Sequence, residues 1–277
     1  MIVALAAASI PSGSMARPGL DPDYGGTVAF LRTPTDIAIA ADSLAVAPDD
    51  PSITRSGCKI YQIGRSNLFI AVAGFDPQAA GGLNQIALIN RAHLANKTIL
   101  ATANAFAQSV IGPLVIELQR LKSDSAVNYG RDFEGKPVIA IIFCGFEKGV
   151  PVVYQRQFIA YTPRDGKISI RVDQMDCPGP LCETDGIGGN VLGEMGIGSG
   201  SVTSASLSFD LADGSTASVR RVVQRRIEDQ AKDRYPGARG PIDLLHITRL
   251  RATWIEHKDE CGSIFPYWRN GLNGMGN

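Results

Sequence analysis

Two blocks of sequence decide the fold: GGTVAFLRTPTDIAIAADSLAV at residues 25–46 and CKIYQIGRSNLFIAVAG at residues 58–74. In both blocks apolar residues alternate with small or polar ones, and Thr-Pro-Thr or Gly-containing turns separate the alternating runs. This pattern predicts four strands, at residues 27–32, 36–41, 59–63 and 67–73. The first two form a hairpin. Each strand is apolar on one side, so we expect a sheet with one covered face.

Length and composition limit the function. The 277 residues, 44% of them hydrophobic, are enough for one large core. The 27 basic and 27 acidic residues balance, so no net charge attracts nucleic acid or anionic lipid. We therefore expect no nucleic-acid partner.

The N-terminal segment resembles part of a secretory signal. Its apolar run, residues 2–10, is too short to span a bilayer, so we expect no stable membrane span. Ser-Met-Ala at residues 14–16 suits the small-residue cleavage site of a signal. This predicts a secreted or periplasmic protein. The alternative is that the segment is a flexible N-terminal extension of a cytoplasmic protein. The expected divisions are a signal-like segment with a propeptide or disordered extension at 1–26, a single domain at 27–261 and a tail at 262–277.

The cysteines and histidines argue against a metal site. Cys177 and Cys182, separated by Pro-Gly-Pro-Leu, suit a small disulfide loop better than a metal knuckle. Cys58 and Cys144 lie in apolar strand sequence, which favours buried thiols. None of the three histidines has ligand spacing with another, so we expect neither a metal nor a cofactor.

The rest of the chain alternates between helical and strand patterns. Helices are predicted at residues 76–97, 99–122 and 217–231, and strands at 137–146, 152–160, 167–172 and, as a pair, within 244–256. We expect an exposed connection at 123–136 and a surface loop or flap at 173–196. No repeat divides this order, which predicts one domain with two helical layers around antiparallel sheets.

Five short motifs stand out along the chain: GTVAF at 26–30, AADS at 40–43, KIYQI at 59–63, VAG at 72–74 and IGSGS at 197–201. They follow the order, and nearly the spacing, of motifs in the N-terminal-nucleophile (Ntn) hydrolases, and the chain resembles the proteasome β-subunit type of that family. The resemblance covers residues 26–256. It implies an α+β fold, the four-layer αββα sandwich, in which two antiparallel sheets lie between helix layers.

The resemblance also implies a chemistry. In that family a threonine freed at the chain terminus uses its hydroxyl as nucleophile and its α-amine as base. Thr27, exposed by self-processing, would take this role and cleave peptide or other amide bonds. Lys59 would lower the pKa values of the hydroxyl and the amine, and Asp42 would hold Lys59 in place. The Gly74 N–H would donate to the oxyanion, with Ser199 in the hydrogen-bond network beside the amine.

The sequence departs from the family pattern at two positions. Counted back without gaps from Asp42, the nucleophile position falls on Gly26, one residue before Thr27. The second Asp of the family is matched only by Asp233, shifted by one residue, and no Ser accompanies it. The alternative to a threonine hydrolase is therefore a noncatalytic proteasome-like scaffold or binding domain, as α-type subunits are. Expected partners are a peptide or amide substrate and identical subunits in a homo-oligomer.

Each motif residue also has an ordinary structural explanation. Asp42 at a strand end is typical of a turn-forming acceptor. Lys59 before a strand is typical of a solvated edge residue. Residues 198–201 could be a flexible connector.

Overall fold

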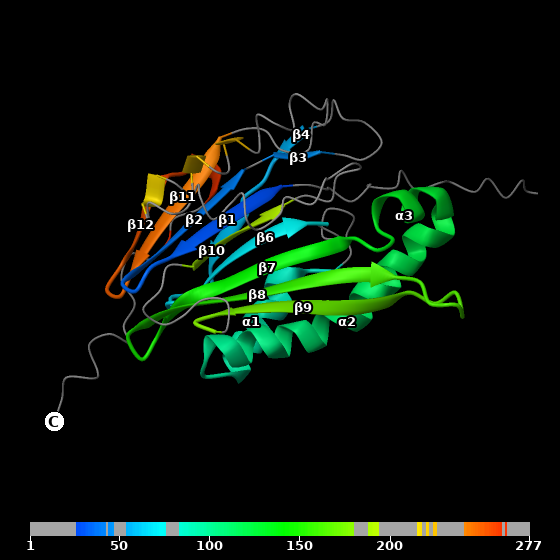
Figure 1. Cartoon of the computed structure of the whole chain (residues 1–277), viewed down its shortest axis with the longest axis horizontal. Helices are drawn as coiled ribbons and strands as arrows, with labels where there is room; N and C mark the ends of the chain where they lie inside the picture. Colours follow the sequence, from blue (N-terminus) through cyan, green and yellow to red (C-terminus); the bar gives the residue numbers. More distant parts are fainter. Residues whose placement is uncertain are drawn as a thin grey trace, which may run out of the picture.

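The computed structural model describes residues 26–42, 44–46, 54–75, 83–179, 188–193, 215–217, 220–221, 224–225, 241–261 and 264. Only the backbone is described for 44–46, 54–56, 188–193 and 260. This part of the chain is a mixed α+β structure with two five-stranded antiparallel sheets (Figure 1). A two-stranded sheet pairs β3 (Leu44–Val46) with β4 (Thr54–Ser56).

The first sheet is built around the predicted hairpin, which is confirmed. Its order is β10-β1-β2-β11-β12, with β1 at Thr27–Arg32, β2 at Asp36–Asp42, β10 at Gly188–Gly193, β11 at Ile242–Thr248 and β12 at Ala252–Glu256. The turn closes because Thr33 N–H donates to the Asp36 carbonyl at 2.9 Å, while Asp36 N–H donates to Thr33 Oγ1 at 3.0 Å. The strand pair predicted within 244–256 is confirmed as β11 and β12.

The second sheet has the order β5-β6-β7-β8-β9, in which the strands follow one another along the chain. Its strands are β5 (Ile60–Gln62), β6 (Phe69–Gly74), β7 (Pro137–Glu147), β8 (Val150–Tyr161) and β9 (Ser169–Cys177). The nearly continuous apolar run of β7 is buried along nine successive residues, as expected for a central strand covered on both faces.

Three helices pack against the second sheet, two along its outer face and the third beyond one end of its strands (Figure 1). They are α1 (Gln85–Ala95), α2 (Ile99–Asp124) and α3 (Ala126–Asp132), with N-caps Asn84, Thr98 and Ser125. Each cap side chain accepts a backbone N–H from the first turn, which satisfies a donor that the helix itself cannot. The prediction of an exposed connection at 123–136 was wrong, because α3 buries Tyr129 and Phe133 against the core.

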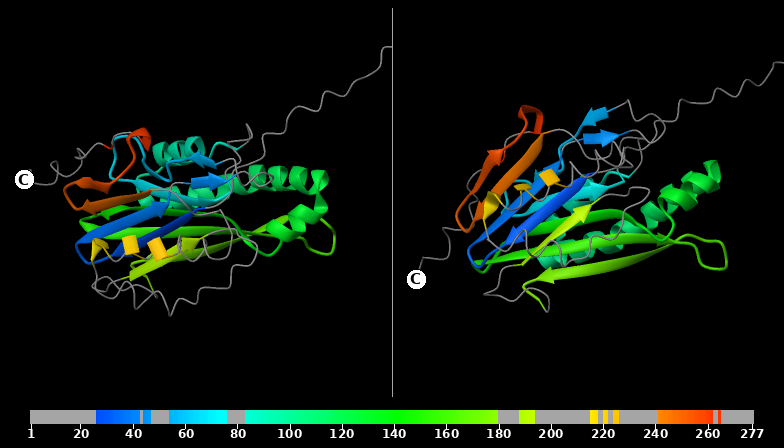
Figure 2. Two further views of the ribbon diagram at one scale, coloured as in Figure 1. Left: turned by 90° about the horizontal axis from the view of Figure 1, so that it is seen from above. Right: turned by 45° about the horizontal axis from the view of Figure 1, so that its top comes forward.

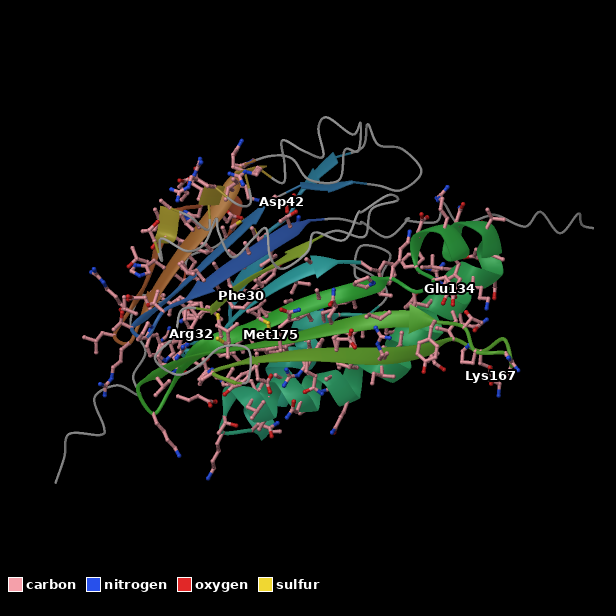
Figure 3. The ribbon with its side chains drawn as sticks, viewed as in Figure 1. Phe30, Arg32, Asp42, Glu134, Lys167 and Met175 are labelled. Carbon is pink, nitrogen blue, oxygen red and sulfur yellow. A yellow bond between two sulfur atoms is a disulfide. The ribbon has the colours of Figure 1, made fainter. Side chains whose placement is uncertain are left out.

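Two hydrophobic cores separate the three layers (Figure 2). Between the helices and the second sheet, Phe106 of α2 packs against Phe143 and Phe158, with ring centroids 5.6 and 6.0 Å apart. Truncating such a buried ring to alanine costs about 3–5 kcal/mol. Between the two sheets, Phe30 is fully buried and Met175 packs at the edge of the same core (Figure 3).

Two fully buried arginines tie these layers together. Arg32, at the far end of β1 from Thr27, donates from Nε to the Pro151 carbonyl of the second sheet at 3.0 Å (Figure 3). Arg156 of β8 lies 2.6 Å from the Asp176 carboxylate of β9 and donates to Asn104 Oδ1 of α2 at 2.8 Å. Buried guanidinium groups need such partners, because a desolvated charge without them is costly.

Helix α2 is the one described helix that is long and apolar enough, by length and composition, to cross a membrane. Its apolar face, however, carries eight residues buried against the rest of the protein. Such a helix is typical of the core of a globular protein, where one face packs and the other meets solvent.

The region after β8 differs from its prediction. The surface loop expected at 173–196 was wrong in part, because β9 continues to Cys177 and residues 188–193 form β10 beside β1. Of the helix expected at 217–231, the described residues 217, 220–221 and 224–225 are helical. Arg220 forms an ion pair with Glu256 at 2.6 Å, which places this helical segment beside β12.

Candidate functional site

A buried carboxylate lies at the end of the first hairpin. The backbone pairing of β1 with β2 brings the start of β1 next to Asp42, the last residue of β2. Asp42 Oδ1 accepts the Thr27 backbone N–H at 2.6 Å and the Lys59 ammonium at 2.7 Å. Asp42 is 0% exposed and Lys59 is 8% exposed. The structure thus unites three of the predicted residues, and the solvated edge position considered for Lys59 is wrong.

The ion pair exists in a water-poor environment. Burial raises the pKa of Asp42 above its ordinary value, while the Lys59 charge, the hydrogen bonds from Lys59 and Thr27, and the more distant Lys258 act in the opposite direction. Removing either partner from such a pair leaves an uncompensated buried charge. The pair therefore depends on the close approach of Asp42 and Lys59.

Gly26 is the residue whose α-carbon faces the Lys59 ammonium. Its φ is +113°, and a Cβ at this position would lie 2.1 Å from Lys59 Nζ and 2.5 Å from Lys59 Cε. Such distances leave no room for any side chain unless the lysine moves. The Lys59 side chain therefore occupies the space that a side chain at position 26 would need.

The Thr27 side chain points to the other face of β1. Successive side chains of a strand alternate between its faces. Val28 and Phe30 belong to the core between the sheets, so the alternation along β1 directs the Thr27 side chain to the opposite face. Thr27 Oγ1 is buried and has no hydrogen-bond partner in the described part of the chain. Thr27 thus contacts the ion pair through its backbone N–H.

One oxygen of Asp42 also lacks a partner. Asp42 Oδ1 receives both donors, whereas Oδ2 is buried without a hydrogen bond among the described residues. An unsatisfied buried polar atom costs free energy. Where the start of β1 meets the end of β2, two buried oxygens therefore have no hydrogen-bond partner among the described residues. They are Thr27 Oγ1 and Asp42 Oδ2.

Gly74 ends β6 at the same end of the second sheet as Lys59. Val72 N–H donates to the Lys59 carbonyl at 2.9 Å, and Gly74 lies two residues further along β6. Its φ is +103°, and a Cβ there would lie 2.4 Å from the Val138 carbonyl oxygen, so glycine is required. The expected oxyanion donor thus lies on the strand that pairs with the backbone of Lys59. Ser199 and Asp233, the other predicted site residues, lie outside the described residues.

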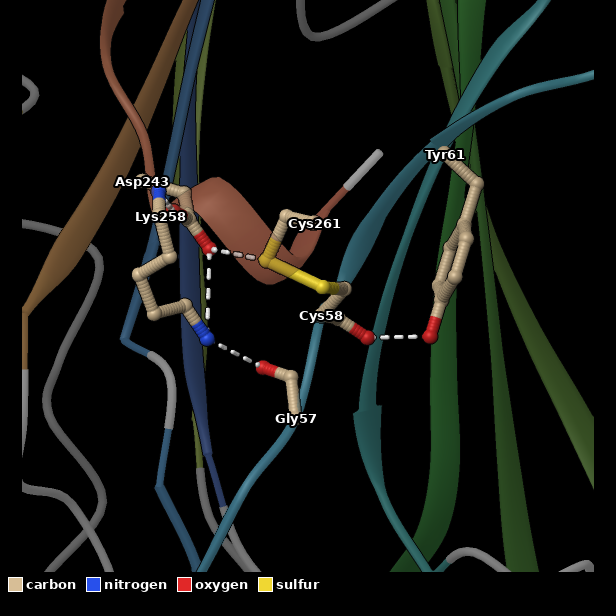
Figure 4. Close-up of a disulfide and its surroundings, with 6 residues drawn as sticks. All are labelled: Gly57, Cys58, Tyr61, Asp243, Lys258 and Cys261. Carbon is tan, nitrogen blue, oxygen red and sulfur yellow. Dashed lines mark hydrogen bonds and ion pairs between the residues drawn. A yellow bond between two sulfur atoms is a disulfide. The ribbon is translucent and has the colours of Figure 1, made fainter. Parts of the chain in front are cut away.

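A second group of polar residues holds the segment that precedes Lys59 (Figure 4). Cys58 is disulfide-bonded to Cys261, and Lys258 Nζ donates to the Gly57 carbonyl at 2.9 Å. The buried Asp243 carboxylate accepts the Lys258 backbone N–H at 3.1 Å and lies 3.9 Å from Lys258 Nζ. The Tyr61 hydroxyl donates to the Cys58 carbonyl. Sequence reasoning missed this group because Asp243, Lys258 and Cys261 are about 200 residues from Cys58 along the chain.

The other cysteines differ in part from their predictions. The prediction that Cys58 is a buried thiol was wrong, since it is disulfide-bonded. Cys144 is confirmed as a free, buried thiol, and burial raises its pKa. Cys177 is disulfide-bonded, and Cys182, its predicted partner, lies outside the described residues. Within the described ranges, no three His, Cys, Asp or Glu side chains are grouped to hold a metal ion.

The arrangement has some but not all parts of a nucleophilic site. A lysine ammonium next to a buried carboxylate can lower the pKa of a hydroxyl or an amine placed beside it. In the intact chain the group beside Lys59 is the α-carbon of Gly26. Compared with protein-family models and with curated proteins, the sequence matches none. The functional argument therefore depends on the geometry of residues 26, 27, 42 and 59.

Proposed function

We propose that the chain is a proteasome-like domain of the Ntn-hydrolase type without a working nucleophile, and that it acts as a binding or assembly domain, with identical subunits as expected partners. The observation that carries this proposal is the contact between Gly26 and Lys59. A nucleophilic hydroxyl must approach the ammonium that activates it. Here glycine faces the ammonium, and the Thr27 hydroxyl has no hydrogen-bond partner in the described part of the chain, Lys59 included.

The order of layers supports the Ntn part of this proposal. Helices, the second sheet and the first sheet are stacked, and the helical residues at 220–221 lie beside β12 through the Arg220–Glu256 ion pair. A helix over the outer face of the first sheet would complete the four-layer αββα sandwich. The contacts of Lys59 with Asp42 and with Gly26 also support it, since that fold would bring these motif residues together.

A covalent probe tests whether a nucleophile is present. The purified full chain is incubated with a peptide epoxyketone, an electrophile that reacts with the hydroxyl and the α-amine of an N-terminal threonine, and its intact mass is measured. We expect no adduct, equally for the natural chain and for Thr27→Ala. An adduct that maps to Thr27 and is lost in Thr27→Ala would overturn the noncatalytic proposal.

A second candidate function is favoured by one specific contact. If the Gly26–Thr27 peptide bond were cleaved, the freed Thr27 amine would start 2.6 Å from Asp42 Oδ1, and the departure of Gly26 would vacate the space beside Lys59. Thr27 could then turn its hydroxyl toward Lys59. This candidate is a self-processing threonine hydrolase that cleaves peptide or other amide bonds, without a cofactor.

The N-terminus of the purified protein distinguishes the two candidates. N-terminal sequencing of the hydrolase would find a chain that begins at Thr27, and Thr27→Ala would block this processing together with amide hydrolysis. A chain that retains the Gly26–Thr27 bond would exclude the hydrolase and support the binding domain.

We also propose that the protein functions outside the cytoplasm, in a secreted or periplasmic location. The Cys58–Cys261 disulfide supports this, because disulfides persist mainly in oxidising compartments. Fractionation of cells expressing the full chain, with the redox state of Cys58 measured by thiol alkylation, would test it. Retention in the cytoplasm with Cys58 reduced would contradict the proposal.

A further inference from the structure

The segment Lys258–Cys261, which we name the C-terminal latch, joins the two sheets beside the Asp42–Lys59 pair. The latch follows β12 of the first sheet, whereas Gly57 and Cys58 lead into β5 of the second. Two contacts cross between them: the Cys58–Cys261 disulfide and the Lys258 Nζ hydrogen bond to the Gly57 carbonyl at 2.9 Å (Figure 4). Cys58 is the residue immediately before Lys59.

The latch is anchored on its own side by Asp243. This residue of β11 is 1% exposed, accepts the Lys258 backbone N–H at 3.1 Å and lies 3.6 Å from Cys261 Sγ. Lys258 is itself only 8% exposed, so its aliphatic chain and ammonium fill the space between Asp243 and Gly57. The latch thus lies beside the segment that carries Lys59, and its Lys258 is near enough to Asp42 to affect the pKa of that carboxyl.

We propose that the Cys58–Cys261 disulfide is a redox switch that controls access of water and ligands to the Asp42–Lys59 pair. The proposal holds whether the site is catalytic or not, because it concerns only the closure of the latch. Both cysteines are partly exposed, so a dithiol reductant can approach the bond. One reductant thiolate attacks one sulfur and the other cysteine leaves as a thiolate; the second reductant thiol then releases the first cysteine. The dithiol is oxidised to a disulfide, and the two protein sulfurs are reduced to thiols.

Reduction removes the covalent part of the closure and leaves the noncovalent part. Noncovalent contacts such as the Lys258 hydrogen bond to Gly57 then hold the latch against local opening, and a charge-assisted hydrogen bond is far weaker than a covalent link. Local opening of this kind does not require global unfolding, because the strand pairing of β5 with β6 and of β1 with β2 is independent of the disulfide.

Lysine acylation followed by peptide mass mapping tests the switch. The oxidised full chain, and the same chain in the presence of dithiothreitol, are treated with an N-hydroxysuccinimide ester. The exposed Lys167 serves as internal reference. We expect the acylation rates of Lys59 and Lys258, relative to Lys167, to rise about tenfold or more on reduction, with circular dichroism unchanged.

A double variant separates this disulfide from that of Cys177. Cys58→Ser with Cys261→Ser should show the fast acylation of Lys59 without reductant, and dithiothreitol should not increase it further. An unchanged Lys59 rate in a chain whose Cys58 is shown by mass to be reduced would overturn the proposal. So would fast acylation that appears only together with loss of circular dichroism, since the bond would then be a structural cross-link of the whole fold.

Discussion

Two buried Lys–Asp pairs lie near one another at the same end of the molecule, and they differ in how directly the charges meet. In the first pair Lys59 Nζ lies 2.7 Å from Asp42 Oδ1. In the second, Lys258 Nζ lies 3.9 Å from Asp243 Oδ2 and makes its shorter contact with the Gly57 carbonyl. Lys59 thus makes a close contact with a carboxylate. Lys258 lies further from its carboxylate and also donates a hydrogen bond to the backbone of another segment.

The comparison shows that one combination of residue types can do two different tasks. The Asp42–Lys59 pair fixes the start of β1, because the same carboxylate oxygen accepts the Thr27 N–H. The Asp243–Lys258 pair fixes the segment that carries Cys58, through the hydrogen bond from Lys258 to the Gly57 carbonyl. Charge burial alone therefore does not mark an active site, and the groups facing each lysine must be compared.

The largest expected effect is that of breaking the first pair. Lys59→Met leaves Asp42 buried without its cation and should lower the free energy of unfolding by about 3–5 kcal/mol. Denaturant unfolding monitored by circular dichroism measures the change, with the exposed Lys167→Met as matched control. A loss below about 1 kcal/mol would show that the pair contributes no more than a surface ion pair.

Breaking the second pair should cost less. Lys258→Met removes a charge-assisted hydrogen bond to the Gly57 carbonyl, while the Lys258 backbone N–H still donates to Asp243. We expect a loss of about 1.5–3 kcal/mol in the same unfolding measurement. A loss equal to that of Lys59→Met would remove the difference between the two pairs and contradict our account of it.

The smallest expected change in the free energy of unfolding is a gain rather than a loss. Thr27 Oγ1 is buried without a hydrogen-bond partner among the residues that the structure describes, and valine has nearly the same shape as threonine. Thr27→Val should therefore be neutral or stabilise the protein by up to about 1 kcal/mol. Thr27→Ser, which keeps the hydroxyl and removes the methyl group, is the matched control and should destabilise. Destabilisation by Thr27→Val beyond about 1 kcal/mol would indicate that the hydroxyl has a partner.

Much of the fold near the site could be predicted from the sequence, because its signals are local. The alternating strands around Thr33 to Asp36 form the predicted hairpin, and the apolar run of β7 forms a central strand. The association of Asp42 with Lys59 was implied by the resemblance to the proteasome type, and the two residues are in contact. The strand patterns depend on residues within a few positions of each other, whereas Asp42 and Lys59 are 17 residues apart and only the resemblance linked them.

The contacts that sequence reasoning missed depend on tertiary structure. Cys58 and Cys261 are 203 residues apart, and the pairing of five cysteines cannot be deduced from their spacing. Helix α3 was not predicted because most residues of this segment are polar. Its two buried aromatics are Tyr129 of α3 and Phe133, which directly follows the helix. The register of β1 against Lys59, which decides whether Gly26 or Thr27 faces the ammonium, requires three-dimensional coordinates.

A double-mutant cycle between Gly26→Ala and Lys59→Ala tests the central claim most directly, because it asks which residue touches the Lys59 side chain. We predict that the two changes are coupled by about 1 kcal/mol or more, since removing the lysine atoms makes room for the new Cβ. The same cycle with Thr27→Val in place of Gly26→Ala should be additive to within about 0.5 kcal/mol. Additivity for Gly26 together with coupling for Thr27 would contradict the account and place the threonine hydroxyl beside Lys59.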